Sequence, residues 1–494
     1  MQKIKPFILF LGPAIFFVLQ AIGPSETIPT EAFSILSATI WIALWWVFEV
    51  VPISVTALLP IVLFPLSGGL DLSTTTASYG HKYVFLYMGG FMIAIAIEKW
   101  NLHKRIALNI ISFVGTNIHR IILGFMLATA FLSMWISNTA TSVMMLPIGI
   151  SIVKQLLDNP LTKANETEVF GKMLMLAIAY SASIGGIATL IGTPPNLVLA
   201  GVISEVYQVE ITFLQWFLFG FPISIILLFI GWIFLTRFAF KLEMIEFPGG
   251  TSEINRMKKE LGSISYEEKV VGLIFGLTAF CWITRSYLLK PLLPALDDTI
   301  IAIIFSILLF VINTKKKEGK LLNWEEAVKM PWGIIILFGG GMALAKGFEV
   351  SGLALWIGSQ MTLISGLSLI LIVIVIITSV NFLTEITSNL ATTAMLIPVL
   401  APIALQLDVH PYMLMVAAAT AASCAFMLPV ATPPNAVVFG SGYLRIPDMI
   451  RTGVFMNIIS IVLLTLMVYF VLPVLWDFVP FEFPEAFKSG VSQL

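Results

Sequence analysis

The sequence predicts an all-α polytopic membrane protein with about 11 transmembrane helices and two re-entrant hairpins arranged as an inverted repeat. Three observations predict this class. Hydrophobic residues make up 58% of the 494 residues and charged residues only 11%, against roughly 25% charged residues in soluble domains. Many apolar runs reach the ~20 residues that a helix needs to cross a bilayer. A polar motif in the middle of such a run also occurs twice.

The duplicated motif is Ser-Asn-x-Ala-Thr, at residues 137–141 and again at 388–392, which is 251 residues later (388 − 137). A second motif, Thr-Pro-Pro-Asn, follows each copy at 193–196 and 432–435, with an offset of 239 residues (432 − 193). Two unrelated motifs that recur at nearly the same spacing predict an internal duplication of the chain.

The apolar runs of the first half predict helices at about 6–22, 33–50, 52–68, 83–99 and 211–238, and one from about 171 that breaks at 192–195. The more polar segment 99–120 predicts an amphipathic helix in the membrane interface. The apolar block 121–156 is interrupted at Ser137, and each arm of about 16 residues spans roughly 24 Å. Because this is short of the ~30 Å bilayer core, the block is predicted to be a re-entrant hairpin.

The second half repeats this order after the charged stretch 241–269. Its predicted elements are helices at about 270–290 and 299–313, a helix from Trp332, an interfacial segment at 350–366, a hairpin at 367–405 with Ser388 and Asn389 at its tip, a helix at 412–440 that breaks at 432–434, and a last helix at 452–475.

Lysine and arginine residues concentrate on one side of these spans, which predicts a cytoplasmic N-terminus and an external C-terminus in the plasma membrane. An odd number of spans separates the hairpins, so the two hairpins would enter from opposite sides. Inverted repeats of this kind place a binding site near the bilayer midplane, at the interface between the repeats.

Both motifs interrupt helices within apolar sequence, where irregular backbone survives only if it is buried in protein or lines a wet cavity. Ser, Asn and Thr at a hairpin tip cap the next helix, leave N–H groups that favour an anion, and offer oxygens to a hard cation. The prolines of the second motif free carbonyl groups such as those of Gly192 and Ala431. One copy alone would more often be a packing device, but symmetric pairs predict one anion site with flanking cations.

At these residues the chain resembles the divalent-anion/sodium symporter family, the INDY-type dicarboxylate carriers. The resemblance covers essentially the whole chain. It implies a secondary active transporter, not an enzyme, that moves dicarboxylates such as succinate, malate, fumarate or 2-oxoglutarate by an elevator mechanism. It also implies a homodimer in the bilayer, with no nucleic-acid partner and no cofactor besides Na⁺ as a possible coupling ion.

The resemblance further implies a scaffold and a mobile transport domain. Residues 1–120 would hold scaffold helices and the interfacial helix, and 121–240 the first hairpin with transport-domain helices. Residues 241–366 would hold a cytoplasmic linker and the second scaffold set, and 367–494 the second hairpin with its transport-domain helices.

The same resemblance assigns roles to residues of both motif pairs. Those implied to hold the substrate are Ser137, Asn138, Thr139, Ser388, Asn389, Leu390, Thr432 and Pro433. Those implied to hold sodium are Ser133, Ser137, Asn138 and Gly192 at one site, and Thr384, Asn389 and Ala431 at its symmetry mate. Leu390 stands where several family members have threonine and offers no hydroxyl, which indicates an altered second carboxylate pocket or a different substrate length.

Several alternatives stay open at this level. Sodium symport and exchange of dicarboxylates both fit the motifs, and citrate, sulfate or another divalent oxyanion is the alternative substrate. A channel could carry the same repeat, whereas the sequence lacks the usual motifs of hydrolases and nucleotide-binding enzymes. Lys346, near the end of the helix from Trp332, has either a scaffold role or an electrostatic role toward the anion.

Overall fold

The computed structural model describes residues 5–115, 117–157, 164–240, 250–315, 319–360 and 366–492. The helices of the first half are α1 (Lys5–Ile22), α2 (Thr30–Phe48), α3 (Ile53–Thr56), α4 (Leu59–Leu66), α5 (Leu72–Ala77), η1 (Ser78–Gly80), α6 (Lys82–Lys99), α7 (Leu102–Val114), α8 (Ile118–Ser133), α9 (Asn138–Leu157), α10 (Ala164–Ile187), α11 (Pro194–Tyr207), α12 (Phe213–Ile233) and η2 (Phe234–Ala239).

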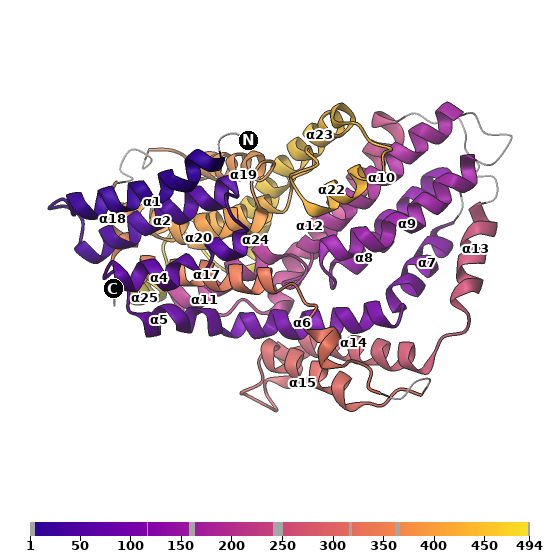
Figure 1. Cartoon of the computed structure of the whole chain (residues 1–494), viewed down its shortest axis with the longest axis horizontal. Coiled ribbons are helices and arrows are strands. Elements are labelled where there is room, and N and C mark those ends of the chain that lie inside the picture. Colours follow the sequence, from indigo (N-terminus) through magenta and orange to yellow (C-terminus); the bar gives the residue numbers. More distant parts are fainter. Residues whose placement is uncertain are drawn as a thin grey trace.

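The helices of the second half are α13 (Gly250–Leu261), α14 (Tyr266–Thr284), η3 (Arg285–Leu289), α15 (Asp298–Val311), α16 (Trp324–Ala327), α17 (Trp332–Val350), α18 (Leu353–Gln360), α19 (Leu369–Leu383), α20 (Asn389–Gln406), α21 (Pro411–Ala422), α22 (Pro433–Phe439), α23 (Ile446–Leu466), η5 (Met467–Val471), α24 (Leu472–Trp476) and α25 (Glu485–Ser492). Among the described residues, ten helices are long and apolar enough to cross a membrane. The predicted all-α membrane fold is confirmed (Figure 1).

The internal duplication appears as two series of helices in the same order, α6 to α12 and α17 to α23. The hairpin helices start at the predicted offset of 251 residues: α8 begins at Ile118 and α19 at Leu369, and α9 begins at Asn138 and α20 at Asn389. Within each series the hairpin helices meet at a short tip, between α8 and α9 and between α19 and α20. The sequence therefore located both hairpins correctly.

The first series also shows why its fifth helix breaks. Helix α10 ends at Ile187, and α11 begins at Pro194 with prolines at its first two positions. Proline has no N–H to donate to the preceding turn, so the helix cannot run through the motif. The matching break separates α21 from α22, which begins at Pro433.

The structure differs from the prediction of one helix at 52–68. This segment forms the two short helices α3 and α4, separated by a turn at Ala57 and Leu58. Pro60 explains the interruption because it has no N–H to donate to the carbonyl of Thr56. The predicted interfacial helix within 99–120 is present as α7, whose buried residues include His103, Ala107 and Ile111 on one face.

Two polar segments contain helices where the sequence pattern predicts none. Helix α10 begins at Ala164, seven residues before the expected start of its span at Gly171. Helix α13 lies in the charged linker, although residues 241–249 of that linker are outside the described residues. Helix α13 contacts α7 and α9, and all three lie at one end of the molecule (Figure 1).

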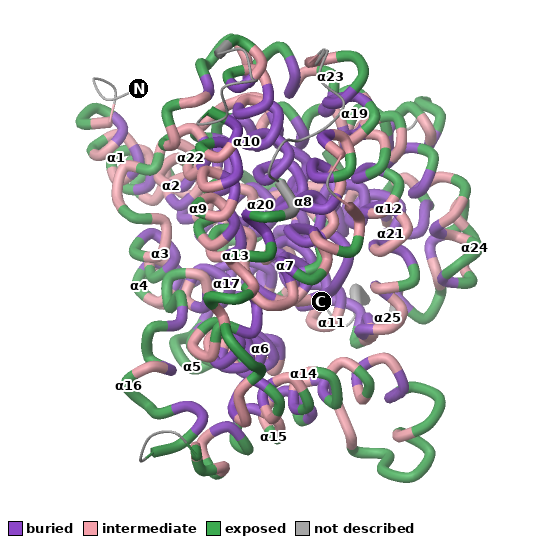
Figure 2. The backbone as a smooth tube through the Cα atoms, turned by 90° about the vertical axis from the view of Figure 1, so that its right-hand side faces the viewer, coloured by how far each residue is buried: buried purple, intermediate pink, exposed green. Residues whose placement is uncertain are grey.

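Burial is greatest around α10 and α11, which carry the first proline break. Within Asn165–Ile187, 94% of the most hydrophobic 18-residue segment is buried, whereas only 17% of α1 is buried. Figure 2 shows the buried segments gathered at the centre and exposed ones around them. The break between α10 and α11 is thus enclosed by protein, as irregular backbone within a membrane must be.

Candidate functional site

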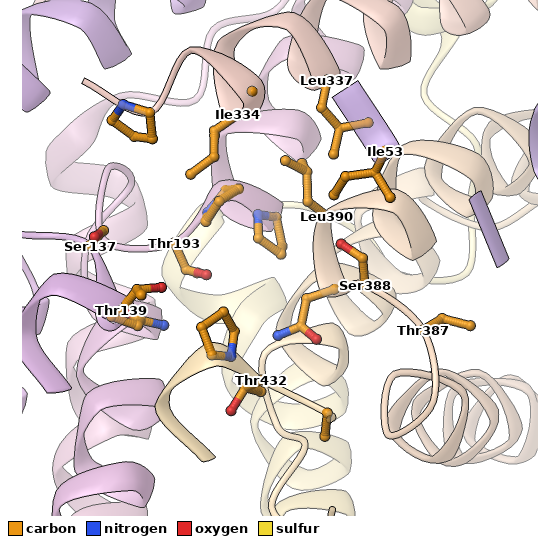
Figure 3. A pocket seen from close by; sticks show the side chains of 18 of the residues that line it. Ile53, Ser137, Thr139, Thr193, Ile334, Leu337, Thr387, Ser388, Leu390 and Thr432 are labelled. Carbon is orange, nitrogen blue, oxygen red and sulfur yellow. The ribbon is translucent and has the colours of Figure 1, made fainter. Parts of the chain in front are cut away.

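The two tips and the two proline breaks meet at one cavity of about 890 Å³. Figure 3 shows side chains from both hairpins facing each other across it, with Thr193 and Thr432 between them. All eight residues predicted to hold the substrate line this cavity: Ser137, Asn138, Thr139, Ser388, Asn389, Leu390, Thr432 and Pro433. The structure therefore brings together segments that are 251 and 239 residues apart in the sequence.

The serine of each tip accepts a hydrogen bond from the helix that follows it. The N–H of Ala140 donates to Ser137 Oγ at 3.3 Å, and the N–H of Ala391 donates to Ser388 Oγ at 3.5 Å. Each serine satisfies one N–H of the first turn and leaves others beside the cavity. A helix N-terminus with free N–H groups favours a carboxylate.

The proline breaks present two further helix N-termini to the same cavity. Thr432 caps α22 by accepting a hydrogen bond from the N–H of Asn435 at 3.3 Å. Thr193 occupies the matching position before α11 and also lines the cavity. The predicted substrate set includes Thr432 but omits Thr193, although the duplicated Thr-Pro-Pro-Asn motif contained the signal for both.

Oxygen atoms gather around Asn138 at the first tip. Ser133 Oγ donates to the carbonyl of Ala182 at 2.6 Å and also lies 2.6 Å from one atom of the Asn138 side-chain amide. The same amide position lies 3.1 Å from Ala182 O and 3.3 Å from Gly192 O. The Asn138 amide can be oriented in two ways. If its nitrogen faces Ser133, Ala182 and Gly192, Asn138 donates hydrogen bonds to their oxygens. If its oxygen faces them, the four oxygens can surround a hard cation, whose ligands lie at about 2.4 Å.

This cluster contains three of the four residues predicted for the first sodium site, and it adds the carbonyl of Ala182, which the sequence did not indicate. Ser133 is fully buried, whereas Ser137 and Asn138 line the cavity. The residues present therefore fit a desolvated cation bound by neutral oxygens.

The second predicted sodium site lies at the other tip. Asn389 and Ala431 both line the cavity, and Thr384 is fully buried behind them. Asn389 Oδ1 is buried and has no hydrogen-bond partner among the described residues. An unpaired buried carbonyl oxygen is unfavourable, and a cation would satisfy it.

Glu385 is a buried carboxylate beside this second tip that the sequence analysis did not single out. It accepts hydrogen bonds at 2.8 to 3.0 Å from the backbone N–H groups of residues 426–428, and one at 2.8 Å from Asn457 Nδ2. Glu385 thereby joins the second tip to the break before α22. The equivalent residue of the first repeat is Met134, which has no carboxylate. This hydrogen-bonded connection is therefore specific to the second repeat.

Part of the cavity wall is apolar. Ile53 comes from α3, Ile334 and Leu337 come from α17, and Leu390 follows the second tip (Figure 3). Among the described residues that line the cavity, Lys5 and Glu49 carry the charged side chains, and Lys5 Nζ donates to the Glu49 carbonyl at 2.7 Å.

Lys346 does not line the cavity. Its Nζ lies 3.0 Å from Glu205 Oε1 and 3.2 Å from Glu349 Oε2. His81 Nε2 is 3.8 Å from the other oxygen of Glu205. Of the two roles open for Lys346 from the sequence, this placement favours the structural one.

Over residues 4–476 the chain matches a family model described as the sodium:sulfate symporter transmembrane region. The chain belongs to this symporter family. It is a multi-pass membrane transporter and not an enzyme. The membership that the paired motifs indicated is confirmed, since the sodium:sulfate symporter match covers both hairpins and both proline breaks.

Relatives of this chain carry the name sodium-dependent dicarboxylate transporter SdcS. The protein from Staphylococcus saprophyticus is 47% identical over 471 residues, which cover 94% of this chain and 91% of the relative. A protein from Staphylococcus aureus is 47% identical over 485 residues, which cover 96% of this chain and 93% of the relative.

Two solved membrane-transporter structures are similar in fold to this chain. Neisseria gonorrhoeae MtrF, described as illuminating a class of antimetabolite efflux pumps, has a TM-score of 0.57 at 15% identity, covering 82% of this chain and 85% of MtrF. The Alcanivorax borkumensis YdaH transporter has a TM-score of 0.57 at 11% identity, covering 87% of this chain and 97% of YdaH. At these identities the likeness concerns the fold alone.

Proposed function

We propose that this protein is a sodium-coupled secondary transporter of small dicarboxylates such as succinate, malate, fumarate and 2-oxoglutarate. One observation carries the proposal: two Ser-Asn tips and two proline-broken helix starts face a single cavity. Each tip supplies N–H groups and a hydroxyl for one carboxylate, and the two tips face each other across the cavity with Thr193 and Thr432 between them. The names of the staphylococcal relatives agree with this chemistry.

The residues divide into two carboxylate positions. Ser137, Asn138 and Thr139 bind one carboxylate at the first tip. At the second tip, Ser388 and Asn389 bind the other, together with Thr432 and Pro433 of the adjacent break and with an apolar contact from Leu390. Because Asn138 also belongs to the oxygen cluster with Ser133, a bound cation fixes the first tip in the form that receives the substrate.

Sodium symport is better supported than exchange. An exchanger has to prevent its empty carrier from returning, which a fixed positive charge near the tips would do. Lys5 lines the cavity, but its Nζ donates to the carbonyl of Glu49 at 2.7 Å, and Lys346 is paired with Glu205. Neutral oxygen ligands at Asn138 and Asn389 are compatible with reversible binding of a sodium ion from solution.

We further propose that the chain works as a homodimer in the plasma membrane, with its N-terminus cytoplasmic and its C-terminus outside. In each protomer, hairpins and broken helices of 121–240 and 367–494 would move as an elevator against a scaffold from 1–120 and 241–366. The apolar wall from α3 and α17 supports this division, because it offers the polar tips a smooth surface without hydrogen bonds to break.

The test is succinate and 2-oxoglutarate uptake into proteoliposomes, with or without an inward sodium gradient and with or without unlabelled dicarboxylate inside. We expect sodium-driven uptake into vesicles that contain no dicarboxylate. Uptake only into preloaded vesicles, indifferent to sodium, would establish exchange instead. Single-channel currents would reveal a channel, since a carrier that moves about 1–1000 substrates per second produces none.

Sulfate is the second candidate substrate because the family description names it. Sulfate carries its charge on one tetrahedral group, whereas a dicarboxylate offers one carboxylate to each tip. Unlabelled sulfate in excess should therefore compete poorly with labelled succinate. Strong competition by sulfate, with weak competition by malate and fumarate, would reverse this ranking.

A further inference from the structure

Each Thr-Pro-Pro-Asn motif ends in an asparagine whose side chain is completely buried. At the first break, Asn196 Nδ2 donates to the carbonyl of Thr189 at 2.8 Å and to that of Gly186 at 3.2 Å. A third, longer contact joins it to the carbonyl of Ile187 at 3.4 Å. The asparagine thus connects the first turn of α11 to the end of α10 across the unwound segment.

The second break has the same arrangement. Asn435 Nδ2 donates to the carbonyl of Leu428 at 3.0 Å and to that of Ala425 at 3.5 Å. Leu428 and Ala425 stand 239 residues after Thr189 and Gly186 (428 − 189 and 425 − 186), which is the offset of the motif itself. The two repeats differ in most side chains around the breaks but keep these two contacts.

These contacts fix carbonyl groups at the end of the helix that precedes each break and in the unwound segment after it. The last carbonyl groups of a helix lack regular N–H donors within the helix, so an unwound segment has no regular pattern to fix its shape. The asparagine amide satisfies two of the carbonyls from the side. Gly192 and Ala431, whose carbonyl groups are the predicted sodium ligands, lie on the segments that the asparagines close.

We propose that Asn196 and Asn435 are positioning residues for the two cation sites, an inference that rests on the proposed sodium coupling. Each holds its unwound segment in the shape that directs the carbonyl of Gly192 or Ala431 toward the cation. Neither asparagine needs to touch the cation or the substrate. Space at the first break is tight, since a Cβ atom at Gly192 would lie 2.5 Å from the carbonyl oxygen of Gly186.

The experiment replaces each asparagine by leucine, which has the same branched shape and no donor, and separately by aspartate. In its protonated form aspartate keeps one donor, so it is the conservative variant. Asn109→Asp is the control, because Asn109 is exposed on α7. Succinate uptake into proteoliposomes is measured against sodium concentration, and the sodium-induced rise in melting temperature is measured in detergent.

Each leucine variant should raise the half-saturating sodium concentration by about fivefold, as expected for the loss of about one buried hydrogen bond. Each aspartate variant should have a smaller effect. The substrate KM at saturating sodium should stay within about twofold of the wild-type value, because the tips are unchanged. The sodium-induced rise in melting temperature should shrink in the same order.

The outcomes separate this inference from the proposed function. If wild-type uptake does not depend on sodium, the proposed function fails. If wild-type uptake depends on sodium but the variants keep the wild-type half-saturation, the asparagines only brace the fold and the inference is overturned. Should a leucine variant fail to fold, the aspartate variant of the same residue decides the question by the same measurements.

Discussion

Lys346 Nζ on α17 lies 3.0 Å from Glu205 Oε1 on α11, and the two side chains form an ion pair. Each residue lies toward the end of its helix that is farther from the cavity. Both helices begin at the cavity, at Gly333 and Ile334 in α17 and at Pro194 in α11. Lys346 is 12 residues beyond Ile334, which corresponds to about 18 Å along the helix. This pair therefore joins the two halves of the proposed elevator on the side away from the cavity.

Lys346→Gln should destabilise the protein more than Glu205→Gln. Removing the lysine leaves Glu205 and Glu349 side by side without a cation, whereas removing Glu205 leaves Lys346 paired with Glu349 at 3.2 Å. We expect a loss of about 1–2 kcal/mol for Lys346→Gln, between the values for exposed and buried pairs. Melting temperatures in detergent measure this, and the opposite ranking would contradict it. The substrate KM should be unchanged in both variants.

Asn138→Ala and Asn389→Ala should each abolish dicarboxylate uptake while the protein stays folded. Both residues begin a hairpin helix at the cavity, and each is predicted to ligate substrate and sodium. Uptake into proteoliposomes and elution as a single folded species are the measurements, with exposed Asn109→Ala as the control. Retained transport in both variants would mean that the tips only cap their helices.

Leu390→Thr should change substrate preference more than stability. Leu390 lines the cavity at the position where the first repeat has Thr139, so threonine would add a hydroxyl at the second carboxylate position. Competition of succinate uptake by malate, fumarate and 2-oxoglutarate measures the preference. Leu400→Thr is the matched control, because Leu400 is also buried on α20 but does not line the cavity. An unchanged competition profile would remove Leu390 from the site.

Gly186→Ala should reduce sodium-driven uptake at least about tenfold. A Cβ atom at residue 186 would lie 2.6 Å from Asn138 Oδ1, so it would displace the amide from its oxygen cluster. Gly276→Ala on α14 is the control, because nothing lies within 4 Å of its Cβ and alanine favours a helix by up to about 1 kcal/mol. Normal sodium dependence in Gly186→Ala would argue against a cation held by Asn138.

Local features of the sequence were sufficient to predict the hairpins, the broken helices and the tip and break residues that line the cavity. The tips before Asn138 and Asn389 and the breaks before Pro194 and Pro433 each depend on residues within one or two turns, so they can be recognised without a structure. The same kind of local effect at Pro60 divides segment 52–68 into two short helices, so the prediction of a single helix there is wrong.

The sequence by itself determined a duplicated, all-helical membrane transporter with four polar interruptions, because apolar run length, proline position and motif repetition act locally. Tertiary structure alone decided which distant groups meet. Glu385 finds its N–H donors about 41 residues away at Phe426, and Lys346 finds Glu205 on another helix instead of the cavity. The physical reason is that hydrogen bonds and ion pairs inside a membrane protein are chosen by the packing of whole helices, and a single residue's neighbours in sequence do not report that packing.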